Sequence, residues 1–243
     1  MKKERGYTMK HRAKYWQGLA TAILVIGALM FSSMEALAAG PQAAQLGEPA
    51  KELSAEWWQW VFSIPASVNP VLDETGVNCV VGQRGDVWFL AGSFGGAVTR
   101  TCSVPEGKVL FFPVINSSQF NSPNACGQAE SLTVKEMRAF ADAFIDGATR
   151  ISVTLDGRPV RNIQRVRSEV FEVSLPTDNI YVFFGVTPCD GGVYSPAVDD
   201  GYYARLDSLR AGEHVLHIHG EIPPISLVVD VTYNLTVVLV TLN

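Results

Sequence analysis

The histidines near the C-terminus are the residues best suited to metal chemistry. The segment GEHVLHIHGE holds His214, His217 and His219, and it ends at Glu221. Because side chains alternate along a strand, His217, His219 and Glu221 are expected on one face and His214 on the other. Two imidazoles and a carboxylate can form an open three-ligand site for zinc or copper. The segment is therefore a candidate divalent-metal site at His217, His219 and Glu221.

The spacing of these histidines is similar to the first motif of the cupins, which include metal-dependent enzymes. In that motif the glutamate stands further from the second histidine, and no histidine follows His219 here to supply a second motif. The alternative is a strand whose histidines are hydrogen-bonded or solvated near a sheet edge. The metal content of the purified protein distinguishes the two hypotheses.

A second candidate is the segment TPCDGGVYSPAVDDGYY at 187–203, which has no clear period and is expected to be an irregular loop. Calcium takes about six to eight oxygen ligands, which such loops supply through carboxylates and carbonyls. Aspartates before glycine also make ordinary turns, and the EF-hand spacing is absent. Calcium ligands would come from Asp190, Asp199 and Asp200. The predicted ligand-binding residues are Tyr194, Asp199, Asp200, Tyr202 and Tyr203.

Three of the five tryptophans stand close together in AEWWQWVFSIP, at Trp57, Trp58 and Trp60. Exposed tryptophans stack on sugar rings, whereas inward ones fill a core. A helical period places Trp57 and Trp60 on one broad apolar arc, and Pro65 ends the helix. The sequence therefore predicts a helix at 50–63 that is pressed into the body of the protein.

Most of the remaining chain consists of β-branched and aromatic runs bounded by turn residues, which are typical of strands. Asp156-Gly157 predicts a type I′ hairpin turn. Thr133 and Glu136 form a capping box that begins a second helix at 133–146. The apolar face expected for this helix is Met137, Phe140, Ala141, Phe144 and Ile145. The basic run at 158–167 is expected to decorate a solvated hairpin.

These elements predict a mainly β fold, a single-domain β-sandwich of jelly-roll or immunoglobulin-like topology over 51–243. The four cysteines are expected to form disulfides, because the pattern lacks the C-x-x-C spacing of a zinc or redox site. Three pairings are possible. The pairs Cys79–Cys102 and Cys126–Cys189 are favoured, since the first flanks one hairpin-like segment.

The first 38 residues have the order of an export signal. Basic residues at 2–14 precede an apolar run at 18–31, and an A-x-A cleavage site follows at 36–38. The apolar run is shorter than the roughly 20 residues that a membrane-spanning helix needs. The chain is therefore expected to be exported to the periplasm or the cell exterior, with a flexible lead-in at 39–50 and no membrane span.

Cleavage after residue 38 removes six basic and two acidic residues and takes the formal net charge from −5 to −9. An acidic exported protein is poorly suited to nucleic acid. Neutral ligands, such as a glycan or another protein, are the expected partners.

Five stretches of the chain are distinctive: EWWQWVFSIP, VWFLAGSFGG, RTCSVPEGKVLFFPVINS, PAVDDGYYARL and LRAGEHVLHIHG. They resemble a family of exported bacterial proteins that carry signal peptides and have no assigned activity. The resemblance covers nearly all of the chain after the leader. It implies one exported domain and no catalytic residues.

Motifs of catalysis are scarce. The chain has no P-loop, no dinucleotide-binding glycine pattern and no H-E-x-x-H, and GSFGG at 92–96 lacks the first glycine of a nucleophile elbow. The sequence predicts a non-enzymatic binding or interaction module. The alternative is a cupin-like enzyme that uses a divalent metal ion at His217, His219 and Glu221.

Overall fold

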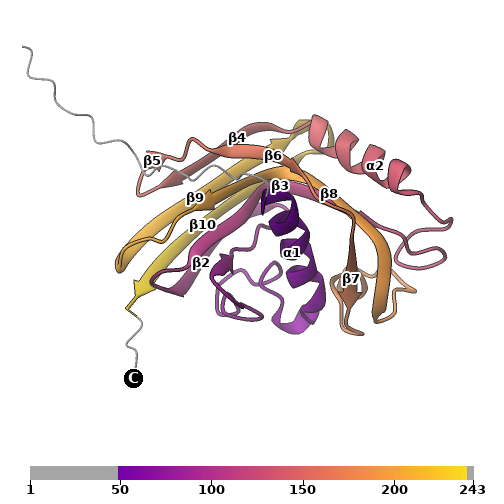
Figure 1. The fold of residues 1–243 in the computed structure, drawn as a ribbon, viewed down its shortest axis with the longest axis horizontal. Coiled ribbons are helices and arrows are strands. Elements are labelled where there is room, and N and C mark those ends of the chain that lie inside the picture. The colour runs from indigo at the N-terminus through magenta and orange to yellow at the C-terminus, as the bar shows by residue number, and fades with distance from the viewer. Residues whose placement is uncertain (1–48, 240–243) are drawn as a thin grey trace, which may run out of the picture. The chain divides into compact units, whose positions relative to one another are not determined.

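The structure, a computed structural model, describes residues 49–239, which form two five-stranded mixed sheets and three α-helices (Figure 1). This arrangement confirms the mainly β fold and the sandwich class. The signal peptide predicted at 1–38, and all but the last two residues of the lead-in predicted at 39–50, lie outside the described residues.

Helix α1 (Pro49–Ser63) is the helix predicted at 50–63. Its alanine, leucine, lysine and glutamate residues favour a helix, and the helix ends two residues before Pro65. Trp57, Trp60 and Val61 are 2%, 6% and 0% exposed, which confirms the broad buried arc. Figure 1 shows α1 lying beneath the curved strands of one sheet, where it forms a third layer.

That sheet, sheet A, has the strand order β1–β3–β8–β6, and β7 also pairs with β8. Its strands are β1 (Val87–Phe89), β3 (Val109–Phe120), β6 (Ile163–Arg167), β7 (Phe171–Leu175) and β8 (Gly192–Leu206). β1 runs parallel to β3, and the other pairs are antiparallel. β8 pairs with three strands and is therefore the centre of the sheet.

β8 overturns the prediction that 187–203 is an irregular loop. The strand begins at Gly192, and its residues from Ala197 to Gly201 are all buried. A strand that is covered on both faces shows no alternation of polar and apolar residues, and alternation is the signal by which strands are recognised. The prolines, glycines and paired aspartates of this segment are therefore compatible with a central strand.

The second sheet, sheet B, has the order β2–β10–β9–β4–β5. Its strands are β2 (Gly96–Pro105), β4 (Thr149–Leu155), β5 (Arg158–Pro159), β9 (Gly212–Ile222) and β10 (Leu227–Val238). β2 runs parallel to β10, and the other pairs are antiparallel. Each sheet thus contains one parallel pair. The sequence alone did not indicate this strand arrangement.

The turn between β4 and β5 consists of Asp156 and Gly157, as predicted. Their φ angles are 51° and 73°. A type I′ turn requires positive φ at both central residues, which explains why Asp-Gly occupies it.

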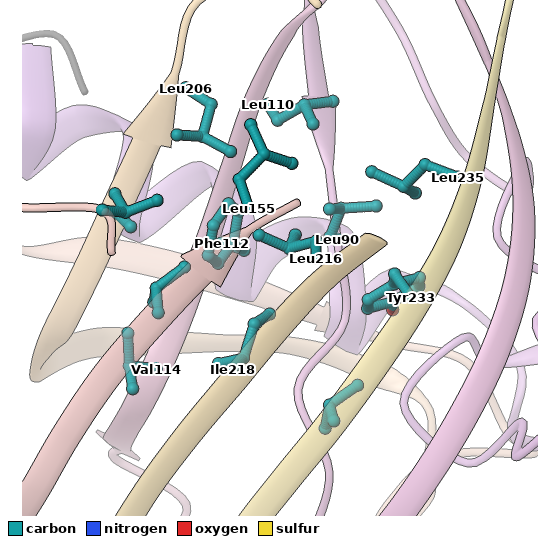
Figure 2. Close-up of a cluster of buried hydrophobic side chains, with 14 of the residues drawn as sticks. Leu90, Leu110, Phe112, Val114, Leu155, Leu206, Leu216, Ile218, Tyr233 and Leu235 are labelled. Carbon is teal, nitrogen blue, oxygen red and sulfur yellow. The ribbon is translucent and has the colours of Figure 1, made fainter. Parts of the chain in front are cut away.

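The main core fills the space between the two sheets (Figure 2). Phe112 of β3, Leu216 of β9 and Tyr233 of β10 are at most 1% exposed. Phe111, the neighbour of Phe112 on β3, belongs instead to the second core, which lies between α1 and sheet A. β3 is therefore covered on both faces, by sheet B and by α1.

Helix α2 (Val134–Asp146) begins at Thr133 with the predicted capping box. The Thr133 hydroxyl accepts a hydrogen bond from the Glu136 backbone N–H at 3.3 Å, and the Glu136 carboxylate accepts one from the Thr133 N–H at 2.8 Å. Met137, Ala141 and Ile145 are buried as expected. Phe140, also predicted on the apolar face, is 57% exposed, because α2 buries a narrower stripe than the sequence suggests.

The remaining helical elements are short: α3 (Ile180–Phe183) and two 3-10 helices, Ala66–Val68 and Pro223–Ile225. Within residues 49–239, no helix combines the length and the apolar character needed to cross a membrane.

Both predicted disulfides are present, Cys79–Cys102 and Cys126–Cys189. The first joins the segment before β1 to β2, and the second joins the β3–α2 connection to the segment before β8. Two disulfides are typical of proteins in an oxidising, exported environment.

Candidate functional site

A cavity of about 460 Å³ opens between α1, β3 and the start of β10. Its volume lies within the range of roughly 300–1,000 Å³ that is typical of small-molecule sites. Its lining includes Val114, Ile115 and Val229 from the core between the two sheets. It also includes Trp57 and Phe62 from the core between α1 and sheet A. The cavity therefore lies at the junction of the two cores.

An irregularity in β3 explains why two consecutive residues of this strand line the cavity. The pairing of β3 with β8 shifts register between Pro113 and Ile115. Such a bulge places an extra residue in one strand and redirects its side chains. Val114 and Ile115, which are 1% and 2% exposed, both belong to the core between the sheets as a result.

Two tryptophans of α1, Trp57 and Trp58, form the apolar floor. The Trp57 indole N–H donates to the Leu90 carbonyl at 3.0 Å, and that of Trp58 donates to Asp199 Oδ1 at 2.6 Å. Because both N–H groups are bonded inside the protein, the two rings contribute apolar surface to the cavity. Trp58 and Phe62 are stacked, with ring centroids 5.0 Å apart. Trp57 and Trp58 are only 2% and 7% exposed, so they do not form an exposed platform for sugars.

Exposed apolar residues line the mouth. Phe94, Phe184 and Ile225 line the cavity and are 48%, 52% and 56% exposed. The Phe94 and Phe184 rings form an edge-to-face contact with centroids 5.0 Å apart, and Phe183 makes a similar contact with Phe184 at 5.2 Å. An exposed apolar cluster of this kind marks a ligand groove or an interaction surface.

The polar side chains of the lining are concentrated on one part of β3, at Asn116, Ser117 and Ser118. The Asn116 amide N–H donates to the Tyr203 hydroxyl at 2.9 Å. The hydroxyls of Ser117 and Ser118 form no hydrogen bond with another described residue. Among the described lining residues there is no aspartate, glutamate, lysine, arginine or histidine. The site is thus apolar and uncharged, with one half-buried polar edge.

Asp199 lies behind this edge and is fully buried. Its Oδ1 accepts hydrogen bonds from Trp58 and from the Tyr203 hydroxyl, at 2.6 and 2.8 Å. Its Oδ2 has no hydrogen-bond partner among the described residues. Burial, with a smaller effect of the Asp200 charge, raises the pKa of Asp199 well above its usual value, although the Trp58 and Tyr203 bonds oppose the shift. Asp199 therefore joins α1 to sheet A, and its burial favours the protonated carboxyl group.

Asp200 points to the other face of β8, toward α2, as neighbouring strand residues do. The Arg165 side chain donates to both Asp200 carboxylate oxygens, with Nε 3.0 Å from each and Nη2 2.6 Å from Oδ2. Arg165 also pairs with Asp146 of α2 at 2.7 Å. Burial and the nearby Asp142 raise the pKa of Asp200, and Arg165 opposes this. Arg165, expected on a solvated hairpin, thus connects α2 to the sheet.

The five residues predicted to bind a ligand do not converge. Asp199, Asp200 and Tyr203 are 0% exposed and form the internal contacts described above. Tyr194 is half-buried, and its hydroxyl donates to the Asp190 carbonyl at 2.8 Å. Tyr202 is half-buried and packs against the core between the sheets. The ligand contacts predicted in an irregular loop are therefore replaced by structural contacts of a central strand.

The predicted calcium site fails for the same geometric reason. Asp199 and Asp200 point to opposite faces of β8, and Asp190 is exposed before the strand begins. Their three carboxylates therefore do not surround one point.

The histidine segment forms β9, and each histidine is paired with a carboxylate. His217 Nε2 lies 2.8 Å from Asp230 Oδ1, while His219 lies 3.4 Å from Asp230 Oδ2 and 3.1 Å from Glu221 Oε1. His214 lies 2.8 Å from Asp156; burial opposes protonation, but this bond raises the pKa of His214. His217, His219 and Glu221 share the outward face as expected. In residues 49–239, however, no three such side chains are arranged to hold a metal ion.

A second, more polar cleft of about 660 Å³ lies between α1, the segment before β1 and β7. Trp60 and Phe89 stand at its base with ring centroids 5.6 Å apart. Trp60 is only 6% exposed, and its indole N–H donates to the Val81 carbonyl at 2.9 Å. The cleft thus offers polar groups but no exposed ring on which a sugar could stack.

Comparison of the chain with protein-family models, with curated proteins and with solved structures finds no match.

Proposed function

We propose that the protein is an exported, non-enzymatic binding module that takes an apolar, uncharged ligand into the cavity between α1 and β3. The observation that carries this proposal is the cavity of about 460 Å³ with an apolar and uncharged lining. A closely packed interior contains few spaces larger than a water molecule. A space of this size beside an exposed aromatic mouth therefore favours a ligand site.

The lining favours an apolar ligand over the glycan expected from the sequence. A sugar ring presents hydroxyl groups around its edge, and burying a hydroxyl without a hydrogen bond costs about 1–3 kcal/mol by protein mutational data. Apart from the bonded indole N–H groups, the polar side chains in the cavity are Asn116, Ser117 and Ser118 of β3, with Ser93 and Tyr181. They suffice for one small polar head and not for a ring of hydroxyls.

Export is part of the proposal and rests on two features. The leader at 1–38 has the order of a signal peptide, and both disulfides suit an oxidising compartment. The resemblance to exported bacterial proteins supports the same location, in the periplasm or outside the cell.

The proposal is tested with N-phenylnaphthylamine, an uncharged dye whose emission rises in apolar surroundings. Wild-type protein is expected to bind it saturably with a stoichiometry near one. Leu227 lines the cavity mouth, so Leu227→Trp should fill part of the space and weaken binding at least about tenfold. The absence of saturable binding by folded wild-type protein would overturn the proposal.

Val228 provides a matched control. It is the next residue of β10, and it does not line the cavity although it is 38% exposed. Val228→Trp adds the same side chain to the opposite face of the strand and should leave dye affinity unchanged. Equal weakening by both variants would mean that the dye binds elsewhere or that added bulk disturbs the strand.

A further inference from the structure

The size, charge and polarity of the cavity together restrict the chemical class of its ligand. This inference rests on the proposed function, because it concerns the same cavity. A methylene group is similar in size to a water molecule, which takes about 30 Å³ of liquid volume, so 460 Å³ holds a chain of about 15 such groups. The cavity is thus large enough for one long alkyl chain.

The floor of the cavity suits such a chain. It is lined by Trp57, Trp58 and Phe62 of α1 and by Val114 and Ile115 of β3, and all five side chains are at most 7% exposed. The indole N–H groups of Trp57 and Trp58 donate to Leu90 and Asp199, so this part of the lining has no free polar group for a ligand. An alkyl chain needs none.

The charge of the lining determines the charge of the ligand. An ionised carboxylate or ammonium group is costly to bury without a partner of opposite charge. The described lining offers no aspartate, glutamate, histidine, lysine or arginine, and burial raises the pKa of the one phenol in it, Tyr181. The nearest carboxyl group, Asp199, is bonded to Trp58 and Tyr203 and does not line the cavity. A ligand that enters completely is therefore uncharged.

The polar edge of β3 supplies the contacts for one uncharged polar head. The hydroxyls of Ser117 and Ser118 have no partner among the described residues, and each can donate and accept a hydrogen bond. Asn116 uses its N–H on Tyr203, which leaves its amide oxygen to accept. The donor and the acceptor of an alcohol or an amide, or the acceptor oxygens of an ester, can be satisfied here.

The same ligand would also explain why the residues at the mouth of the cavity are exposed. Phe94, Phe184 and Ile225 are about half exposed although they are apolar. A chain that passes between them would cover part of this surface. We infer that the ligand is a neutral single-chain amphiphile, such as a fatty alcohol or a monoacylglycerol, whose head lies at Asn116–Ser118 and whose tail lies on the Trp57–Trp58 floor.

Displacement of bound N-phenylnaphthylamine tests this inference with three competitors of equal chain length, each used below its micelle concentration. They are monolauroylglycerol, laurate at pH 8 and dodecyltrimethylammonium. Monolauroylglycerol is expected to displace the dye at a concentration at least about tenfold lower than either charged competitor. Equal or better displacement by a charged competitor would overturn the assignment of a neutral head. Dye binding without displacement by any of them would overturn the alkyl chain, and failure of the dye to bind would instead overturn the proposed function.

The placement of the head is tested by the double variant Ser117→Ala/Ser118→Ala. It should weaken monolauroylglycerol about tenfold while dye affinity stays unchanged, because the dye does not need these hydroxyls. Gln119→Ala, the next position of β3 and not part of the lining, is the control and should change neither. An unchanged affinity for monolauroylglycerol in the double variant would overturn this placement.

Discussion

Asp199 provides the sharpest test of the packing that supports the cavity floor. Its carboxyl group joins Trp58 of α1 to Tyr203 of β8, and burial raises its pKa well above the usual value of about 3.9. The folded state therefore favours the protonated carboxyl group more strongly than the unfolded chain does. Between these two pKa values the free energy of unfolding falls as pH rises, because the folded state binds more protons.

Asp199→Asn should remove this pH-dependent loss of stability. The amide oxygen of asparagine can accept from Trp58 and Tyr203 as Oδ1 of aspartic acid does, and it has no charge to bury. At pH 7 the variant should be at least as stable as wild type, and its advantage should shrink as the pH is lowered toward 4. Asp199→Ala leaves two buried donors unpaired and should lose about 1–3 kcal/mol for each.

Urea unfolding at several pH values between 4 and 8 measures these differences. Asp190→Asn is the control, because Asp190 is exposed and should contribute no such trend. The account of Asp199 is refuted if Asp199→Asn loses more than about 2 kcal/mol at pH 7, since that would mean the buried group is a needed charge. A pH-independent difference between Asp199→Asn and wild type would refute it as well.

Three further substitutions test the framework by urea unfolding. Trp57→Ala should lose about 3–5 kcal/mol, as truncations of large core side chains do, and a loss below about 1 kcal/mol would contradict its burial. Arg100 is 1% exposed and donates to the carbonyls of Asp73, Ala91, Gly92 and Val71, so Arg100→Met should lose about 2–4 kcal/mol; near-neutral behaviour would contradict these bonds. Arg165→Met leaves buried Asp200 with only Arg167 as a cation, at 3.7 Å, and should lose up to about 3–5 kcal/mol at pH 7, with a smaller loss at pH 4, where protonation of Asp200 is favoured. A loss that does not change with pH would contradict that assignment.

The parts of the fold that were predictable from the sequence depend on local patterns. The helical period around Trp57 and Trp60, the capping box at Thr133, and the Asp156-Gly157 turn each act within a few residues. The two disulfides were predictable because one pair flanks a short segment. Side-chain alternation likewise placed His217, His219 and Glu221 on one face of β9, as the structure has them.

The parts that failed depend on contacts between distant segments. In the sequence, Asp199 and Asp200 resemble turn residues. In the fold, Asp199 is bonded to Trp58, 141 positions earlier, and Asp200 is bonded to Arg165, 35 positions earlier. The metal hypothesis took no account of Asp230, which pairs with two of the histidines across the β9–β10 hairpin.

The cavity was not predictable, because α1, β3, α3 and β10 each contribute a few residues to it. One local signal was nevertheless present. The run FFPVINSSQF changes from apolar to polar residues within a single strand, and this change marks the polar edge at Asn116–Ser118. A second local signal is the pair of consecutive aromatic residues Phe183 and Phe184, which lies in a short segment bounded by turn residues.

The most direct test of the central claim is quenching of tryptophan emission by dodecanol that carries bromine on its terminal carbon. Bromine quenches tryptophans that it contacts, and Trp57 and Trp58 line the cavity whereas Trp88 does not. Trp88→Phe is a suitable control, because the Trp88 N–H is buried without a described partner. A ligand in the cavity predicts saturable quenching that persists in Trp88→Phe and decreases in Trp57→Phe. Quenching that rises linearly without saturation, or that is lost in Trp88→Phe and kept in Trp57→Phe, would contradict the claim.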